Sequence, residues 1–137
     1  MQSDTEWVPI DNLGFSAVAG PFFCSAATEG PVRYSFVAAE HHLNNIGIVH
    51  GGMVMTFADF AMGAAVADEN GKMPTTIQLD VQFIGSARLG DRVEIACRTV
   101  SETRNMLFLD GIVSVGGVIT ATARGVWKKR RKKEEGQ

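Results

Sequence analysis

The sequence has few of the residues that mark several common classes of protein. Only two of its 137 residues are cysteines, Cys24 and Cys97, which is too few for the disulfide framework of a small secreted domain. We therefore expect two small buried thiols and a reducing, cytoplasmic location. Charged residues make up 20% of the chain, and the formal net charge is only −2. The chain lacks the strong positive field of a nucleic-acid binder, so we expect no nucleic-acid partner.

Several sequence signals of cofactor binding and membrane insertion are also missing. The chain has no Walker-type phosphate loop, no GxGxxG motif and no zinc-type spacing of Cys and His, so we predict no metal site. His41 and His42 are adjacent, and we expect their rings to point apart. The first six residues lack the positive charge that begins a signal peptide. The longest apolar run, 51–67, has Asp59 at its centre, which disfavours a membrane span and indicates a buried helix.

The residues that are present suffice for one folded domain. Hydrophobic residues make up 45% of the 137-residue chain, whose length is usual for a single domain. We divide it into an N-terminal segment packed on the body (1–20), a central domain (21–127) and a basic tail (128–137). The tail carries six Lys or Arg and two Glu, a net +4, while seven Lys or Arg and thirteen Asp or Glu elsewhere give −6. Such a tail is typical of a solvated terminus or of a contact for anionic groups.

The spacing of hydrophobic residues changes along the chain from strand to helix and back to strand. Residues 51–68 are apolar at nearly every position, which predicts a helix covered on most sides. Later segments alternate apolar and polar residues, as half-buried strands do, and Gly116-Gly117 predicts a two-residue hairpin turn. Strands are expected at 21–27, 32–39, 76–83, 92–98, 106–115 and 118–127. Short connections favour antiparallel pairing, so we predict an α+β fold, an antiparallel sheet of five or six strands wrapped around one long helix.

A dense polar cluster surrounds the start of the predicted helix. It comprises Asn44, Asn45, Gly47, His50, Gly51 and Gly52, with Asp59 nine residues after the histidine. A helix N-terminus has unpaired N–H donors and the positive end of the helix dipole. Because Gly51 and Gly52 have no side chains, such donors can approach a developing oxyanion. The glycines also fit a steric hinge at the helix entry, and His50 also fits a hydrogen-bonded loop residue.

Asp59 is the polar residue that is hardest to explain structurally. A carboxylate within so apolar a helix costs free energy unless another group pairs with it or uses it. No Lys or Arg lies within one turn on either side, although Thr56, one turn earlier, is near enough to hydrogen-bond it. Asp59 is therefore a candidate general base or nucleophile.

Together these residues resemble a known family. The pattern Asn44-x-x-Gly47-x-x-His50-Gly51-Gly52, followed by Asp59, is similar to that of the hotdog-fold acyl-CoA thioesterases of the PaaI type, in the 4-hydroxybenzoyl-CoA thioesterase superfamily. The resemblance runs from about residue 21 to residue 127. It implies a sheet wrapped around a long helix, in agreement with the hydrophobic spacing. It also implies hydrolysis of an acyl-CoA thioester without a metal or other cofactor.

The resemblance assigns roles to the residues at the helix start. The backbone N–H of Gly51, assisted by Asn44, would polarise the thioester carbonyl. His50 would orient the loop and the thioester, and Gly52 would lie beside the bound substrate.

The resemblance also implies a second set of residues and an assembly. Asp59 would activate water as general base or attack as nucleophile, and Thr76 would help to place the water. In this family the Asn and Gly come from one protomer, and the Asp and Ser or Thr come from its partner. A homodimer with shared active sites is therefore implied, either alone or as half of a tetramer.

Other features leave several functions open. Arg88 and Arg104 lie in predicted turns, where they are candidates to bind the phosphates of coenzyme A or are solvated turn residues. Large apolar residues of the helix fit either an acyl tunnel or the core, namely Met53, Met55, Phe57 and Met62. The alternatives to a thioesterase are a hotdog hydratase or dehydratase of enoyl or hydroxyacyl thioesters and a non-catalytic acyl-CoA-binding module. The sequence does not select an acyl group.

Overall fold

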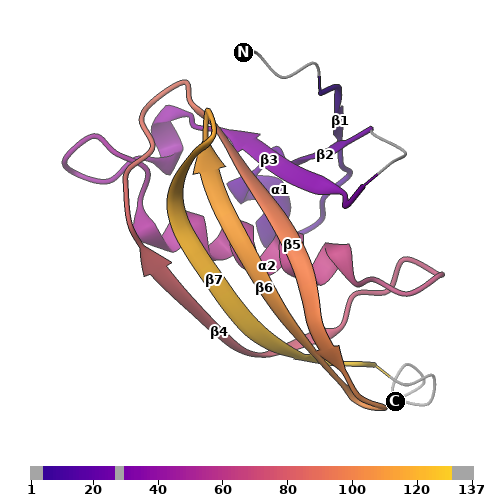
Figure 1. Cartoon of the computed structure of the whole chain (residues 1–137). Coiled ribbons are helices and arrows are strands. Elements are labelled where there is room, and N and C mark those ends of the chain that lie inside the picture. Colours follow the sequence, from indigo (N-terminus) through magenta and orange to yellow (C-terminus); the bar gives the residue numbers. More distant parts are fainter. Residues whose placement is uncertain (1–4, 27–29, 131–137) are drawn as a thin grey trace.

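The computed structural model describes residues 5–26 and 30–130, which form strands around one long helix (Figure 1). Short elements come first: β1 (Trp7–Pro9), α1 (Phe15–Ala19), β2 (Phe23–Ser25), β3 (Arg33–Val37) and the 3-10 helix η1 (Glu40–His42). The long helix α2 (Gly51–Ala65) precedes β4 (Thr75–Phe83), β5 (Arg92–Glu102), β6 (Met106–Val115) and β7 (Val118–Lys128). None of the helices within the described ranges is both long enough and apolar enough to cross a bilayer.

Helix α2 ends at Ala65, earlier than the predicted end at residue 68. Val66 leaves the helical conformation with φ −120° and ψ 22°. The Asp68 carboxylate then accepts hydrogen bonds from the backbone N–H groups of Asn70 and Lys72, both at 2.9 Å. A side chain that bonds nearby backbone in this way favours a turn over a continued helix.

All strands of the described residues belong to one antiparallel sheet in the order β1-β2-β3-β5-β6-β7-β4. These residues therefore form seven strands, and the predicted number of five or six was wrong. The strand that was not predicted is β1, whose three residues pair with β2 but are too few to give an alternating pattern. At the other edge of the sheet, β4 pairs with β7 and leaves its outer side without a neighbouring strand in the described chain.

The core lies between α2 and the sheet, which curves around the helix in Figure 1. Phe57 and Met62 of α2 and Trp127 of β7 are fully buried, and burying side chains of this size contributes roughly 1.5–3 kcal/mol each. Gly111 of β6 lets the helix approach, because a Cβ atom there would lie 3.2 Å from the Sδ atom of Met62. Met55 remains 38% exposed, so one face of the helix is not covered.

The turn between β6 and β7 is the predicted two-residue hairpin. Gly116 and Gly117 have φ values of +56° and +84°. Two successive residues with positive φ suit the tight turns that match the twist of paired strands, and glycine adopts them without a steric cost.

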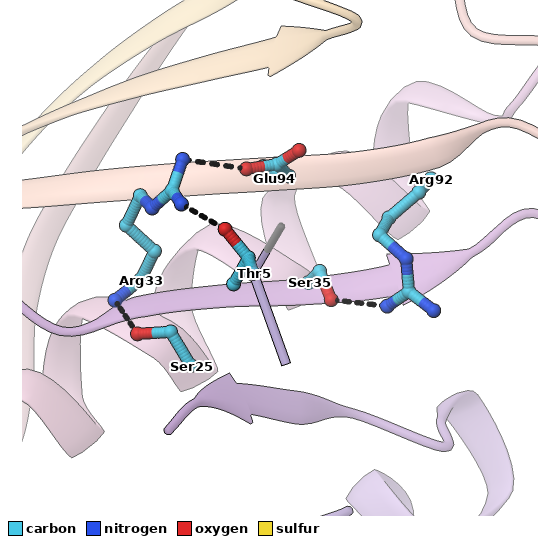
Figure 2. Close-up of polar contacts among 6 residues, drawn as sticks. All are labelled: Thr5, Ser25, Arg33, Ser35, Arg92 and Glu94. Carbon is cyan, nitrogen blue, oxygen red and sulfur yellow. Dashed lines mark hydrogen bonds and ion pairs between the residues drawn. The ribbon is translucent and has the colours of Figure 1, made fainter. Parts of the chain in front are cut away.

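Two arginines hold the N-terminal strands to the rest of the sheet (Figure 2). Arg33 donates to Glu94 of β5 at 3.0 Å and to the Thr5 hydroxyl at 2.6 Å. Arg92 donates to the buried Ser35 hydroxyl at 2.7 Å. These charge-assisted bonds connect β3, β5 and the residues before β1 at positions that are only partly exposed.

Gly125 of β7 is expected to tolerate no side chain. A Cβ atom there would lie 2.6 Å from the Trp127 ring and 2.7 Å from the Gln78 carbonyl oxygen of β4. Overpacking of this kind typically costs about 1–3 kcal/mol, so Gly125→Ala should lower the free energy of unfolding in urea by that amount. The matched control is Gly85→Ala, whose Cβ would meet nothing nearer than 3.6 Å. Equal stability of the two variants would contradict this packing.

Candidate active site

The first turn of α2 leaves one N–H group without a partner. The His50 carbonyl accepts from the N–H groups of Met53 and Val54 at 2.9 and 3.2 Å. The His50 ring caps the helix, since its Nδ1 atom accepts from Gly52 at 2.7 Å. Of the four N–H groups at this helix end, only that of Gly51 has no acceptor among the described residues. It lies at the positive end of the helix dipole.

The loop before the helix places Asn44 beside this donor. The Asn44 side-chain oxygen accepts from the N–H groups of Ile46 at 3.0 Å and Ile48 at 3.2 Å. Its amide nitrogen has no acceptor in the described part of the chain and remains available as a donor. Asn44 and Gly51 line one hollow together with Phe83 from the end of β4. The structure thus brings Asn44 and Gly51 together, while His50 and Gly52 bond each other at the start of the helix.

Asp59 and Thr76 form the second group of predicted site residues. The Thr76 hydroxyl, at the start of β4, donates to Oδ1 of the half-buried Asp59 at 2.6 Å. Thr56, the other neighbour weighed from the sequence, instead donates to the Gly52 carbonyl at 2.9 Å. The second oxygen of Asp59 has no partner among the described residues. One bond thus fixes the carboxylate and leaves an oxygen able to accept a proton.

The two groups do not meet within one chain. Gly51 and Asp59 are eight residues apart in α2, which is about 12 Å along the axis at the usual rise. They also lie at opposite ends of β4. A Cβ atom on Gly51 would be 3.3 Å from the ring of Phe83, the last residue of β4, whereas Asp59 bonds Thr76 near its first residue. β4 therefore runs antiparallel to α2, with one group at each of its ends.

The two candidate arginines lie far from each other. Arg88 adjoins the Asn44 loop, since it forms a β-bridge with Ile48. Arg104 lies in the turn beyond the other end of β5, and an eleven-residue strand is roughly 35 Å long. The structure places Arg88, but not Arg104, beside the Asn44 and Gly51 group.

Only part of the predicted basic tail is described. Lys129 pairs with Glu102, and Arg130 donates to the Met73 carbonyl at 3.0 Å. Both cations therefore bond within the chain. Residues 131–137 lie outside the described residues.

The expectation that the His41 and His42 rings point apart was wrong, because their centroids are 3.9 Å apart. His42 is buried and bonds the backbone on both sides. Its Nδ1 accepts from Ala39 at 3.0 Å, so Nε2 carries the hydrogen and donates to the Ala19 carbonyl at 2.6 Å. No cluster of three or more His, Cys, Asp or Glu able to hold a metal occurs in the described part of the chain.

His42 also supports the loop before α2, which the sequence did not indicate. Its backbone carbonyl accepts from the His50 N–H at 2.8 Å. Its partner Ala19 is 23 residues away in the chain, and such a contact has no local pattern. The only available signal was a histidine pair beside the polar cluster.

Comparison with known proteins relates this chain to thioesterases. A family model described as the thioesterase superfamily matches residues 46–122. A Pseudomonas aeruginosa protein named as a candidate esterase is 33% identical over 110 residues, covering 79% of this chain and 82% of that protein. The human protein named acyl-coenzyme A thioesterase 13 is 25% identical over 95 residues, covering 69% of this chain and 68% of that protein.

A solved structure confirms the fold. A variant of the phenylacetic acid degradation protein PaaI from Thermus thermophilus matches with a TM-score of 0.72 and 20% identity, covering 85% of this chain and 98% of that one. The predicted hotdog architecture, with one long helix and an antiparallel sheet, is therefore present.

The burial of His42 makes stability depend on pH. Burial lowers the pKa of His42 below its usual 6.5. Just below pH 6.5 the His42 side chain is therefore protonated more readily in the unfolded chain than in the folded chain. The stabilisation is complete above that pH and decreases as the pH falls below it. In urea unfolding between pH 7.5 and 5.5, His42→Gln should be less stable than wild type at pH 7.5 and lose less stability on acidification. An unchanged pH slope in His42→Gln would contradict this assignment.

Proposed function

The chain belongs to the thioesterase superfamily and is a thioester hydrolase, and from that premise we propose that it hydrolyses acyl-coenzyme A to a free acid and coenzyme A. The observation that carries the proposal is the unpaired Gly51 N–H at the start of α2, beside the Asn44 amide. Two donors at a helix N-terminus are suited to a thioester carbonyl whose oxygen gains negative charge during attack. Such donors are typically worth about 10²–10³-fold in rate each.

Asp59 either activates the attacking water or is itself the attacking group. As general base, its free oxygen accepts a proton from water while the water oxygen bonds the carbonyl carbon. The tetrahedral intermediate then expels the thiolate, which takes the proton from Asp59 and leaves as coenzyme A. As nucleophile, Asp59 would instead form an acyl anhydride that water hydrolyses in a second step. The 2.6 Å bond from Thr76 orients the carboxylate for either role, and neither role requires a metal or redox cofactor.

A complete site requires two copies of the chain, because Gly51 and Asp59 lie at opposite ends of β4 in each. β4 is an edge strand of nine residues that exposes Ile77 and Phe83 to 54% and 52%. An uncovered apolar edge of this kind is suited to pairing with another strand.

Antiparallel pairing of two β4 edges completes both sites at once. It brings the Thr76 end of each β4 beside the Phe83 end of the other, with the two-fold axis near the middle of the strand. Asp59 and Thr76 of one copy then adjoin Gly51 and Asn44 of the other. We propose this homodimer as the active unit, and two such dimers form the tetramer if one exists.

Asp59→Asn should abolish turnover and keep the fold. Loss of a general base typically costs about 10²–10⁴-fold, measured as release of free thiol from a panel of acyl-CoAs. The control is Asp11→Asn, which changes an exposed carboxylate between β1 and α1 and should retain activity. Wild-type thiol release by Asp59→Asn would contradict the mechanism. Loss of enoyl absorbance without thiol release by the wild type would indicate a hydratase instead.

Mixing two inactive variants tests whether sites are shared. Asn44→Asp keeps the oxygen that accepts from Ile46 and Ile48 but removes the amide donor. In a mixed dimer, one site combines Asn44 of the Asp59→Asn copy with Asp59 of the Asn44→Asp copy and is therefore intact. The other site contains both substitutions. After subunit exchange of equal amounts, roughly a quarter of wild-type activity should return, since half the dimers are mixed and each has one of two sites. If native mass spectrometry shows that the subunits have exchanged but no activity returns, each site lies within one chain.

A further inference from the structure

Two hollows adjoin the start of α2. The first, of about 210 Å³, is lined by Asn44, Gly51 and Phe83 together with Ser86 and Thr120. The second, of about 450 Å³, lies between α2 and α1, and we name it the α1 groove. Its lining includes His50, Gly52 and Met53 from the helix start, and Phe15, Val18 and Leu43 opposite. The α1 groove is thus continuous with the residues that hold the thioester, and its volume is usual for a small-molecule site.

The apolar side chains of α1 are exposed to an unusual degree. Phe15 is 69% exposed and Val18 is 72% exposed, although both are large hydrophobic residues. Only Ala19 of this helix is buried. The core therefore does not account for Phe15 and Val18, and an exposed apolar surface beside a polar site indicates contact with an apolar ligand or partner.

The two walls of the α1 groove are fixed to each other. The buried His42 side chain bonds the Ala19 carbonyl at the end of α1, and the His42 carbonyl accepts from the His50 N–H. The His50 ring in turn lies against Gly52, where a Cβ atom would be 3.0 Å from Nδ1. One buried residue thus connects α1 to the cap of α2, so the groove is formed before a ligand binds.

The chemistry of the two hollows matches the two arms of an acyl-CoA. The pantetheine and nucleotide arm carries amides and phosphates, and the first hollow offers hydroxyl and amide groups, with Arg88 immediately after its lining residue Ala87. The acyl arm is apolar, and the α1 groove is lined by apolar side chains of α1, by Leu43 and Met53, and by His41, His42, His50 and Thr56. No Asp, Glu, Lys or Arg of the described residues lines it, so phosphates would lose their hydration there without gaining a permanently charged partner.

We propose that the α1 groove binds the acyl chain of the substrate and makes the enzyme selective for aliphatic acyl groups long enough to reach Val18. This inference rests on the proposed acyl-CoA hydrolysis and specifies the substrate class. The thioester carbonyl lies at Gly51, the coenzyme A arm leaves past Asn44 toward Arg88, and the acyl chain lies between α1 and α2. Each methylene buried in the groove improves transition-state binding by up to about fourfold.

The test compares chain-length dependence in two variants of the α1 region. We expect kcat/KM of the wild type to rise from acetyl-CoA through butanoyl-CoA and hexanoyl-CoA to octanoyl-CoA. Val18→Glu places a charge in the groove and should flatten this rise, with at least a tenfold loss on octanoyl-CoA and little change on acetyl-CoA. The matched control, Leu13→Glu, adds the same charge at a residue that is 90% exposed and does not line the groove, and should keep the wild-type profile.

Two results would overturn the inference. An unchanged profile in Val18→Glu would place the chain elsewhere, and equal losses on acetyl-CoA and octanoyl-CoA would leave Val18 only a structural role. Calorimetry with non-hydrolysable S-alkyl-CoA thioethers separates these failures from failure of the proposed function. Affinity that rises with alkyl length in wild type but not in Val18→Glu supports the groove even without turnover. Affinity independent of alkyl length in the wild type contradicts it.

Discussion

The packing of α2 against the sheet determines the rest of this molecule. The helix buries Phe57 and Met62 beneath the strands and thereby fixes where its two ends lie relative to β4. Its first residue then contacts Phe83, and its third turn bonds Thr76. The Gly51 donor and the Asp59 carboxylate are thus held apart, and for this reason we propose that a second copy brings them together.

The helix start shows how backbone geometry provides chemistry without a charged side chain. His50 bonds the N–H groups of Gly52, Met53 and Val54 through its ring and its carbonyl, and the N–H of Gly51 has no acceptor among the described residues. Glycine at this position keeps the donor accessible, and the Asn44 loop is folded by its own side chain so that the amide remains available. The formal net charge of the chain is −2, so local dipoles and Arg88 have to supply the attraction for a polyanionic ligand.

Much of this arrangement was predictable because it depends on the spacing of hydrophobic residues or on turn-forming residues. The long helix, the alternating strands and the Gly116-Gly117 turn each have a local pattern, and the spacing from Asn44 to Asp59 indicated a site. The bond between Asp59 and Thr76 joins residues 17 apart and was not predicted; the resemblance to a family suggested only that Thr76 helps to place the water.

The features that sequence reasoning missed depend on short elements or distant contacts. β1 has three residues and α1 has five, too few to show a period. The role of His42 depends on Ala19, and the exposure of Phe15 and Val18 depends on where α1 docks. Of the apolar helix residues, Met53, Phe57 and Met62 are core, while Met55 remains partly exposed, a difference that is set by the sheet and not by the helix sequence.

The most direct test of the shared site is a crystal structure with an acyl-CoA analogue in which a methylene group replaces the thioester sulfur. We expect the carbonyl oxygen of the analogue to lie about 2.7–3.1 Å from the Gly51 nitrogen of one copy, the usual distance for an oxyanion donor. The nearest carboxylate to the carbonyl carbon should be Asp59 of the second copy. A carbonyl bound away from Gly51, or approached by Asp59 of the same chain, would contradict the central claim.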